Sequence, residues 1–135
     1  MTAGYSGTLL PRKLGIKPGS TLAVINDPGH LFELMGPLPD GVRSKTDARG
    51  NADTALFFTM RRRELERRID SLSRLIFPAG SLWVCWPKRA SGVPTDVTED
   101  VVREVVLPRG LVDVKVAAVD DTWSGLRVVH RRENR

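Results

Sequence analysis

Side chains suited to ligand chemistry occur in two segments of the second half of the sequence. One segment begins with Lys88, directly after an apolar run, and the other includes Asp121, which follows a second apolar run. An ammonium group can bind an anion, a carboxylate can orient that ammonium or accept a proton, and an indole can stack on a planar ring. The candidate ligand-binding residues of these segments are Lys88, Ser91, Thr95, Asp121, Trp123 and Ser124.

A third group of polar residues lies at the end of the first apolar run. Asn26 closes the run over residues 21–26, and Asp27 follows it. In open α/β sheets, ligands bind outside the carboxyl ends of the strands. We therefore predict that Asn26 and Asp27 share one edge of a sheet with Lys88 and Asp121. His30 could act there as a general acid or base, but a single histidine without a positioned partner is usually a surface residue.

Each candidate also has a structural interpretation. Lys88 could be a solvated loop residue. Asp96 followed by Glu99 is a capping-box pattern, which predicts that Asp96 caps a helix. The N-terminus of that helix would offer backbone N–H donors to an anion bound by Lys88. For Lys88 and Trp123, the ligand-binding and the structural interpretations both stay open.

Alternating apolar runs and amphipathic segments predict the elements that position these residues. The expected strands cover residues 21–26, 53–59, 81–86, 112–119 and 125–131, with a weak edge strand near Val42. The expected helices lie within residues 6–16 and over residues 30–34, 60–77 and 96–107. Strands that alternate with helices indicate a mostly parallel sheet covered on both faces, and the closing pair without a helix between them should be antiparallel. We predict one α/β domain over residues 1–135, a three-layer Rossmann-like fold with a mostly parallel sheet and a C-terminal antiparallel strand.

The composition is that of a soluble globular protein. It contains 41% hydrophobic and 27% charged residues, and no apolar run approaches the roughly 20 residues that a membrane span needs. The N-terminus lacks the basic start and apolar centre of a signal peptide. Cys85 is the only cysteine, which excludes an internal disulfide and fits a reducing compartment. One cysteine and two histidines are too few for a zinc site, so we expect no bound metal. The missing signal-peptide pattern and the single cysteine predict a cytoplasmic protein.

The net charge is +5, and arginines cluster in two places. Arg61, Arg62 and Arg63 stand at the start of the predicted helix 60–77, where the helix dipole disfavours cations. Arg131 ends the last predicted strand, which we expect at the edge of the sheet, and Arg132 follows it. These clusters could bind a phosphate, an acidic protein surface or nucleic acid, although no nucleic-acid motif accompanies them. The structural alternative is a solvated charged face.

The second half of the sequence resembles a known fold family. Residues 53–131 combine an apolar strand, an amphipathic helix, the turn Pro78-Ala79-Gly80, a further strand and helix, and two closing strands. This order is similar to the second half of class I S-adenosylmethionine-dependent methyltransferases. In that family, the Pro-Ala-Gly turn leads into the strand that here covers residues 81–86. The resemblance implies a Rossmann-like fold.

A narrower resemblance spans nearly the whole sequence. The sequence is similar to a family of short actinobacterial proteins of unknown function with a Rossmann-like fold, which implies a fold and no activity. The motifs that carry this resemblance are Ser6-Gly7-Thr8, Lys13-Leu14-Gly15-Ile16, Trp86-Pro87-Lys88, Thr95-Asp96-Val97-Thr98-Glu99 and Trp123-Ser124-Gly125-Leu126.

The first half departs from the methyltransferase pattern in two ways. Methyltransferases need a glycine-rich turn after the first strand, whereas this sequence has Asn26-Asp27-Pro28-Gly29-His30. An acidic residue at the end of the second strand normally holds the ribose of the cofactor, whereas this region reads Val42-Arg43-Ser44-Lys45. Both departures favour a protein with no cofactor. The first hypothesis is therefore a non-catalytic, regulatory Rossmann-like module that binds a small anion or a protein partner.

Two alternatives belong to other functional classes. One is a small methyltransferase-like transferase with a non-standard cofactor mode that uses Lys88 and Asp121. The other is a nucleic-acid binder that uses the two arginine clusters. A homo-oligomer is a further expectation, because Phe32, Leu34, Met35 and the proline-rich turn over residues 37–39 could form an exposed apolar patch beside a short edge strand.

Overall fold

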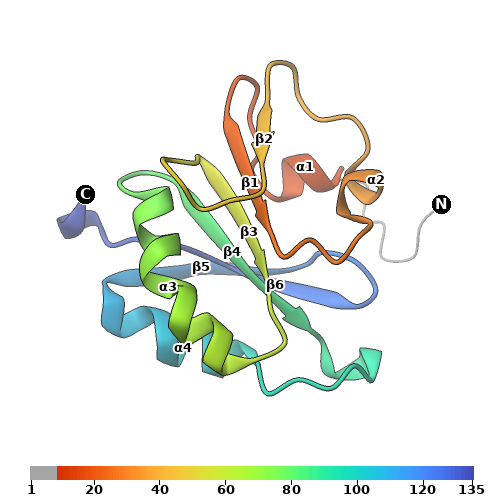
Figure 1. Cartoon of the computed structure of the whole chain (residues 1–135), viewed down its shortest axis with the longest axis vertical. Helices are drawn as coiled ribbons and strands as arrows, with labels where there is room; N and C mark the ends of the chain where they lie inside the picture. Colours follow the sequence, from red (N-terminus) through yellow and green to blue (C-terminus); the bar gives the residue numbers. More distant parts are fainter. Residues whose placement is uncertain (1–8) are drawn as a thin grey trace.

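The computed structural model describes residues 9–135, which form a six-stranded sheet with helices on both faces (Figure 1). The strands lie in the spatial order β2-β1-β3-β4-β6-β5. Strands β1 to β4 are parallel to one another, whereas β6 is antiparallel to both β4 and β5. The strands are β1 (Thr21–Ile25), β2 (Arg43–Lys45), β3 (Thr54–Phe58), β4 (Ser81–Pro87), β5 (Leu111–Ala118) and β6 (Trp123–His130).

Four α-helices complete the layers around the described sheet. Helices α3 and α4 lie side by side on one face, and α1 and α2 lie near β1 on the other (Figure 1). The α-helices are α1 (Leu10–Lys13), α2 (Leu31–Met35), α3 (Arg62–Ile76) and α4 (Glu99–Val106), and short 3-10 turns are η1 (Arg89–Ser91), η2 (Leu107–Arg109) and η3 (Arg132–Asn134). This arrangement confirms the predicted three-layer Rossmann-like fold and its antiparallel end.

Helix α3 forms because its apolar residues recur every three or four positions. Leu65, Ile69, Leu72 and Ile76 fall on one stripe, and all four are buried against the sheet together with Leu75. The stripe contacts β3, β4 and α4 through a core cluster that includes Phe57 and Val105. Tertiary burial of this face therefore holds a helix whose outer face carries mainly charged residues.

The opposite face of the sheet has a second core cluster beneath α1 and α2. Trp83 on β4 is fully buried there, and its indole Nε1–H donates to the carbonyl of Leu14 at 2.9 Å. Met35 is also buried, whereas Leu34 is half-buried and Phe32 is 38% exposed. The predicted apolar surface patch is therefore wrong for Met35, because α2 turns this side chain into the core.

Two predictions about the last strands are corrected by the structure. The final strand begins at Trp123 rather than at residue 125, so Trp123 and Ser124 pair with β4 instead of lying in a turn. This strand lies between β4 and β5, so β5 is the edge strand and the basic residue Arg127 lies on an interior strand. Both differences arise because β6 inserts between β4 and β5 and is antiparallel to each. The sequence alone does not determine which of β5 and β6 lies next to β4.

The predicted cap of α4 is also wrong. Thr98 is the N-cap, and its hydroxyl accepts a hydrogen bond from the backbone N–H of Val101 at 3.2 Å. Asp96 instead accepts the backbone N–H of Arg62 at 2.7 Å, which ties the loop after β4 to the first turn of α3. None of the helices in residues 9–135 has both the length and the apolar character that crossing a membrane requires.

Candidate functional site at the carboxyl edge

The order of the strands creates a switch point between β1 and β3. From β1 the chain passes to β2 on one side and then returns to β3 on the other. Connections that diverge in this way leave a crevice outside the carboxyl ends of the two strands, where open α/β sheets bind ligands. Asn26 follows β1, Thr59 follows β3 and Lys88 follows β4, so all three lie at this edge. Trp123 joins them because it pairs with Pro87, the last residue of β4.

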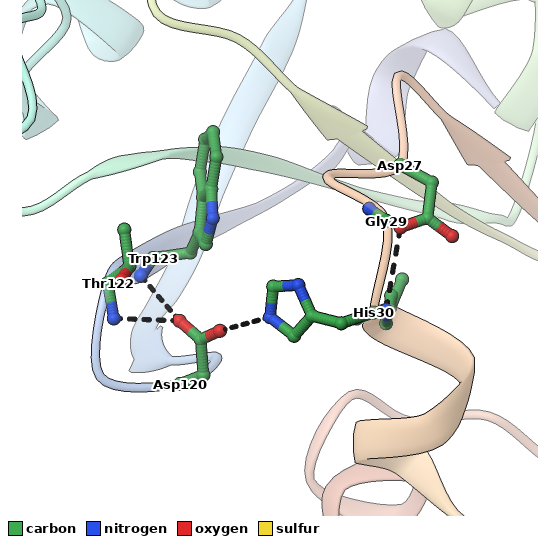
Figure 2. A network of polar contacts seen from close by, with 7 residues as sticks. Asp27, Gly29, His30, Asp120, Thr122 and Trp123 are labelled. Carbon is green, nitrogen blue, oxygen red and sulfur yellow. Dashed lines mark hydrogen bonds and ion pairs between the residues drawn. The ribbon is translucent and has the colours of Figure 1, made fainter.

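A histidine and an aspartate from distant parts of the sequence meet at this edge. His30, in the loop between β1 and α2, contacts Asp120, in the turn between β5 and β6, with 2.8 Å between His30 Nε2 and Asp120 Oδ2. Figure 2 shows the imidazole extending from its loop toward the carboxylate. The side chain of Asp120 is 14% exposed and that of His30 is 46% exposed. The pair therefore has one protected member and one member open to solvent.

Local hydrogen bonds hold each member of the pair in place. The backbone N–H groups of Thr122 and Trp123 donate to Asp120 Oδ1 at 2.8 and 2.7 Å (Figure 2). On the other loop, Asp27 Oδ1 accepts the backbone N–H of Gly29 at 2.7 Å. Aspartate commonly makes such turns by accepting the N–H two residues ahead. Gly29 has a φ of +112°, a conformation that favours glycine, so this residue allows the loop to present His30.

The charge state of Asp120 follows from these contacts. Partial burial acts to raise the pKa of Asp120, but the hydrogen bonds from His30, Trp123 and Thr122 outweigh it and hold the pKa below its ordinary value. Ionised Asp120 can only accept hydrogen bonds, so the Nε2 atom of His30 must carry a proton. In a neutral imidazole, Nδ1 then keeps its lone pair. This is the arrangement in which a carboxylate fixes the tautomer of a general base.

A second network of hydrogen bonds links the carboxyl ends of β1 and β3. Asn26 Nδ2 donates to the carbonyl of Phe58 at 3.2 Å and to Glu64 Oε2 at 3.0 Å. The other carboxylate oxygen of Glu64 accepts the hydroxyl of Thr59 at 2.7 Å. Asn26 has a φ of +60°, which non-glycine residues other than Asn and Asp adopt uncommonly. The asparagine therefore reverses the backbone after β1 and also joins the two strand ends.

Trp123 lies between the candidate site and the core. Its ring makes an edge-to-face contact with Phe58, with 5.1 Å between the ring centroids and 88° between the planes. The residue is half-buried and packs against the core cluster beneath α1 and α2. This contact favours the structural interpretation of Trp123 and leaves only part of the indole for a ligand. Ser124 pairs with Trp86 and Ala118 inside the sheet, next to the site.

The loop after β4 uses its hydroxyl groups to stabilise itself. Ser91 Oγ donates to the carbonyl of Lys88 at 2.7 Å, and Thr95 Oγ1 donates to the carbonyl of Met60 at 2.7 Å. The backbone N–H of Lys88 donates to the carbonyl of Thr122 at 2.8 Å, which fixes where this half-buried lysine leaves the sheet. Asp121 is exposed in the turn after β5. The structure thus brings Lys88, Asn26, Asp27 and Trp123 to one edge. The hydroxyls of Ser91 and Thr95 instead donate to backbone carbonyls and stabilise the loop.

The two arginine clusters lie at opposite edges of the sheet. Arg61, Arg62 and Arg63 stand where α3 begins, after the carboxyl end of β3. Arg62 is engaged by Glu66 and Glu104 at 3.1 and 2.6 Å, which raises the pKa of its guanidinium. Arg131 and Arg132 follow β6, whose carboxyl end lies beside the amino end of its antiparallel neighbour β4. The clusters therefore do not form one continuous basic surface.

The other reactive groups of the described residues have structural roles. Within residues 9–135, no group of three or more His, Cys, Asp or Glu side chains gathers to hold a metal ion. Cys85 is fully buried, and burial together with the charge of Asp120 raises the pKa of its thiol. The thiol is therefore a poor nucleophile.

Sequence reasoning missed the partner of His30. Asp121 was the predicted ligand-binding aspartate of this turn, but the aspartate that contacts His30 is its neighbour Asp120. A signal was present in the sequence, because an aspartate followed two and three residues later by Thr122 and Trp123 can form a turn that buries its carboxylate. Glu64 was also missed as a site residue, because nothing local in the sequence indicates its contacts with Asn26 and Thr59.

Comparison with solved structures supports the fold. The chain is similar to an S-adenosylmethionine-dependent methyltransferase from Aquifex aeolicus, with a TM-score of 0.59, 14% identity and coverage of 87% of this chain and 85% of the other. The chain is also similar to a protein from Sulfolobus solfataricus that is provisionally named a type 11 methyltransferase. The TM-score is 0.59 at 15% identity, and the alignment covers 90% of this chain and 89% of the other. A magnesium protoporphyrin IX methyltransferase from Synechocystis with bound SAH gives 0.56 at 14% identity, with 84% and 75% covered.

Sequence comparisons add nothing to this likeness. No family model matches the sequence. No curated protein matches it either. The resemblance to short actinobacterial proteins therefore stays a prediction. At identities this low, the structural likeness shows a methyltransferase-like Rossmann fold and does not extend to the activity of the neighbours.

The residues at the carboxyl edge do not fit S-adenosylmethionine in the usual mode. Strand β2 ends at Lys45, whose ammonium group donates to the carbonyl of Arg49, where the fold family would place an acidic residue for the ribose. Glu64, the carboxylate beside β1 and β3, already accepts hydrogen bonds on both oxygens. A cofactor of this class would need a different set of contacts.

Proposed function

We propose that the protein is a small methyltransferase-like transferase that binds its ligands at the carboxyl edge in a non-standard mode, with His30 as the general base. The observation that carries the proposal is the 2.8 Å contact between His30 and Asp120, two residues that lie far apart in the sequence. A carboxylate that fixes one imidazole nitrogen and leaves the other accessible is the arrangement that proton abstraction needs.

The chemistry of the pair follows from its protonation. His30 donates through Nε2 to Asp120, so Nδ1 would accept the proton of a hydroxyl or amine on the acceptor molecule. The imidazolium formed in this step would be stabilised by the negative charge of Asp120. Lys88, at the end of β4, would attract an anionic group of a ligand bound beside Trp123.

The fold supports this proposal over a purely structural role for the edge. The solved neighbours include several methyltransferases, which makes transfer chemistry the reasonable expectation for a sheet of this topology. The departures at Asn26 and Lys45 are the reason for a non-standard mode.

The test combines binding and turnover. Isothermal titration calorimetry with S-adenosylmethionine and S-adenosylhomocysteine measures affinity, and release of S-adenosylhomocysteine in the presence of a metabolite extract measures transfer. We expect His30→Gln to bind as the wild type does and to lose about 100-fold or more of the transfer rate, the usual contribution of a general base. Glu33→Gln, on the exposed face of α2, is the matched control. A His30→Gln variant with undiminished turnover would exclude His30 as the base.

A non-catalytic binding module is the second candidate, and the saturated hydrogen bonding of the edge favours it. Asp120 accepts three hydrogen bonds, and Glu64 joins Asn26 to Thr59. Groups engaged in this way could simply hold the loops together around an anion or protein site. Tight binding of a small anion without turnover, lost in Lys88→Ala, would favour this candidate over the transferase.

A further inference from the structure

A second pocket lies at the opposite, amino edge of the sheet. It has a volume of about 400 Å³ and is formed by the segment before β1, the starts of β3 and β4, and the second half of β6. Its polar lining consists of Lys17, Ser20, Asp53, Thr54, Ser81 and Arg127. The volume falls within the range of small-molecule sites. This pocket shares no residue with the carboxyl-edge site.

Arg127 is the central cation of this amino-edge pocket. The residue is half-buried, and its Nε–H donates to the hydroxyl of Ser81 at 3.0 Å. Within residues 9–135, no carboxylate lies within ion-pair distance of its guanidinium. Anchored through Nε, the planar group keeps two nitrogens that can bind an oxyanion.

A like-charge pair supports an anion at this position. Arg127 on β6 pairs directly with Lys115 on β5, so both side chains lie on the same face of the sheet. Like charges directly opposite each other on neighbouring strands are destabilising. Lys17 is the second cation that lines the pocket, and the exposed Lys115 lies outside its lining. A bound anion would offset this repulsion.

The remaining polar groups narrow the class of ligand. The hydroxyls of Thr54 and Ser81 can donate hydrogen bonds to an anion with several oxygens, whereas the Ser20 hydroxyl already donates to the carbonyl of Lys17 at 2.6 Å. Asp53 accepts the backbone N–H of Thr21 through Oδ2 at 2.8 Å, which leaves Oδ1 as an acceptor for a ligand donor. We propose that the amino-edge pocket binds a small phosphorylated hydroxy compound, whose phosphate contacts Arg127 and Lys17 and whose hydroxyl donates to Asp53.

Nuclear magnetic resonance with two probes tests this proposal. Inorganic phosphate reports on the anion subsite, and ribose 5-phosphate adds the hydroxyl groups. The Nε–H resonance of Arg127 should shift saturably with both probes. We expect Arg127→Gln to weaken binding of both probes about tenfold or more and Lys17→Gln to weaken it several-fold, because charge-assisted hydrogen bonds are lost. Arg132→Gln, an exposed arginine outside the pocket, is the matched control and should bind normally.

Substitution of Asp53 separates the two parts of the ligand. Asp53→Asn keeps an oxygen acceptor for Thr21 and removes the negative charge, so affinity for inorganic phosphate should rise while the preference for ribose 5-phosphate over phosphate falls. If Arg127→Gln does not fold, Lys17→Gln carries the test, since Lys17 is exposed and lies outside the sheet. Equal losses in Lys17→Gln and Arg132→Gln, or phosphate shifts that do not saturate, would overturn the proposal.

Discussion

Replacement of Asp120 by asparagine is the sharpest perturbation of the pair with His30. The amide oxygen of Asn can keep both hydrogen bonds that the carboxylate accepts from the backbone N–H groups of Thr122 and Trp123. The amide nitrogen then faces His30 Nε2 and donates to it, so the imidazole must carry its proton on Nδ1 instead. The variant therefore preserves the shape of the turn and reverses the tautomer of His30.

The structure sets the size of the effect. The substitution replaces a charge-assisted hydrogen bond of 2.8 Å by a neutral one. Hydrogen bonds to charged groups contribute roughly 1.5–3 kcal/mol, against about 1 kcal/mol for neutral ones. The difference therefore lies between about 0.5 and 2 kcal/mol, and because His30 is 46% exposed, solvent screening places it in the lower half of this range, at about 1 kcal/mol. For a chain of 135 residues, this loss lowers the melting temperature by about 3–4 °C.

Urea unfolding followed by tryptophan fluorescence measures the difference, with Asp121→Asn as the matched control. Asp121 is the exposed neighbour, so its substitution removes the same charge and should leave the free energy of unfolding unchanged within about 0.5 kcal/mol. Nitrogen-15 chemical shifts of the imidazole report the tautomer directly. If Asp120→Asn matched Asp121→Asn in stability and left the His30 tautomer unchanged, the assignment of an ionised, positioning Asp120 would be wrong.

The pH dependence supplies a second check on the same pair. The pKa of Asp120 in the folded protein lies below its ordinary value of 3.8. The unfolded state therefore takes up the proton first as the pH falls, so the contribution of Asp120 to stability is complete above about pH 5 and is lost as the pH falls through the lowered folded-state pKa. The stability difference between wild type and Asp120→Asn should shrink in the same window. A difference that stayed constant down to pH 3 would show that the charge of Asp120 does not contribute.

Three further predictions concern the scaffold. Trp83→Phe should lower the free energy of unfolding by about 2–4 kcal/mol, because it removes buried ring volume and leaves the carbonyl of Leu14 without its 2.9 Å donor; Trp86→Phe is the control in urea unfolding, and an equal loss in both would contradict this role of the indole. Gly80→Ala should destabilise by about 1–3 kcal/mol or more in thermal unfolding, since a Cβ would lie 2.6 Å from the carbonyl oxygen of Ala52 and 2.9 Å from that of Ile76; an unchanged melting temperature would refute this packing. Asp96→Ala should speed hydrogen exchange at the Arg62 amide and leave that of Val101 unchanged, whereas Thr98→Ala should do the reverse, each at a cost of about 1 kcal/mol; the opposite pattern would restore the capping box.

Local sequence patterns predicted most of the fold. The apolar runs that became β1, β3 and β4 are buried along their whole length, or nearly so, and such runs can be recognised without tertiary information. The stripe of α3 was predictable for the same reason. The position of β6 between β4 and β5 was not, because two closing strands of similar composition can pair in either spatial order.

The sequence predicts that the candidate site lies at the carboxyl edge of the sheet, but it does not predict the contact between His30 and Asp120. Asn26, Asp27 and Lys88 follow apolar strands, and the carboxyl ends of parallel strands meet at one edge. The pairing of His30 with Asp120 depends on two turns whose side chains satisfy their own backbones, at Asp27 and Asp120. Likewise, Asp96 caps α3 rather than α4 because the loop after β4 folds back over Met60. Contacts between distant loops of this kind have no local signal in the sequence.

The most direct test of the central claim is a titration of the nitrogen-15-labelled protein with S-adenosylmethionine, followed residue by residue. If the carboxyl edge binds this cofactor in a non-standard mode around His30, saturable shifts should appear at residues 26–30 and 120–123, with little change at Ser44 and Lys45 of β2. The shifts at residues 120–123 should weaken in Asp120→Asn. Absence of any saturable shift at the carboxyl edge would contradict the transferase and leave the binding module as the better account.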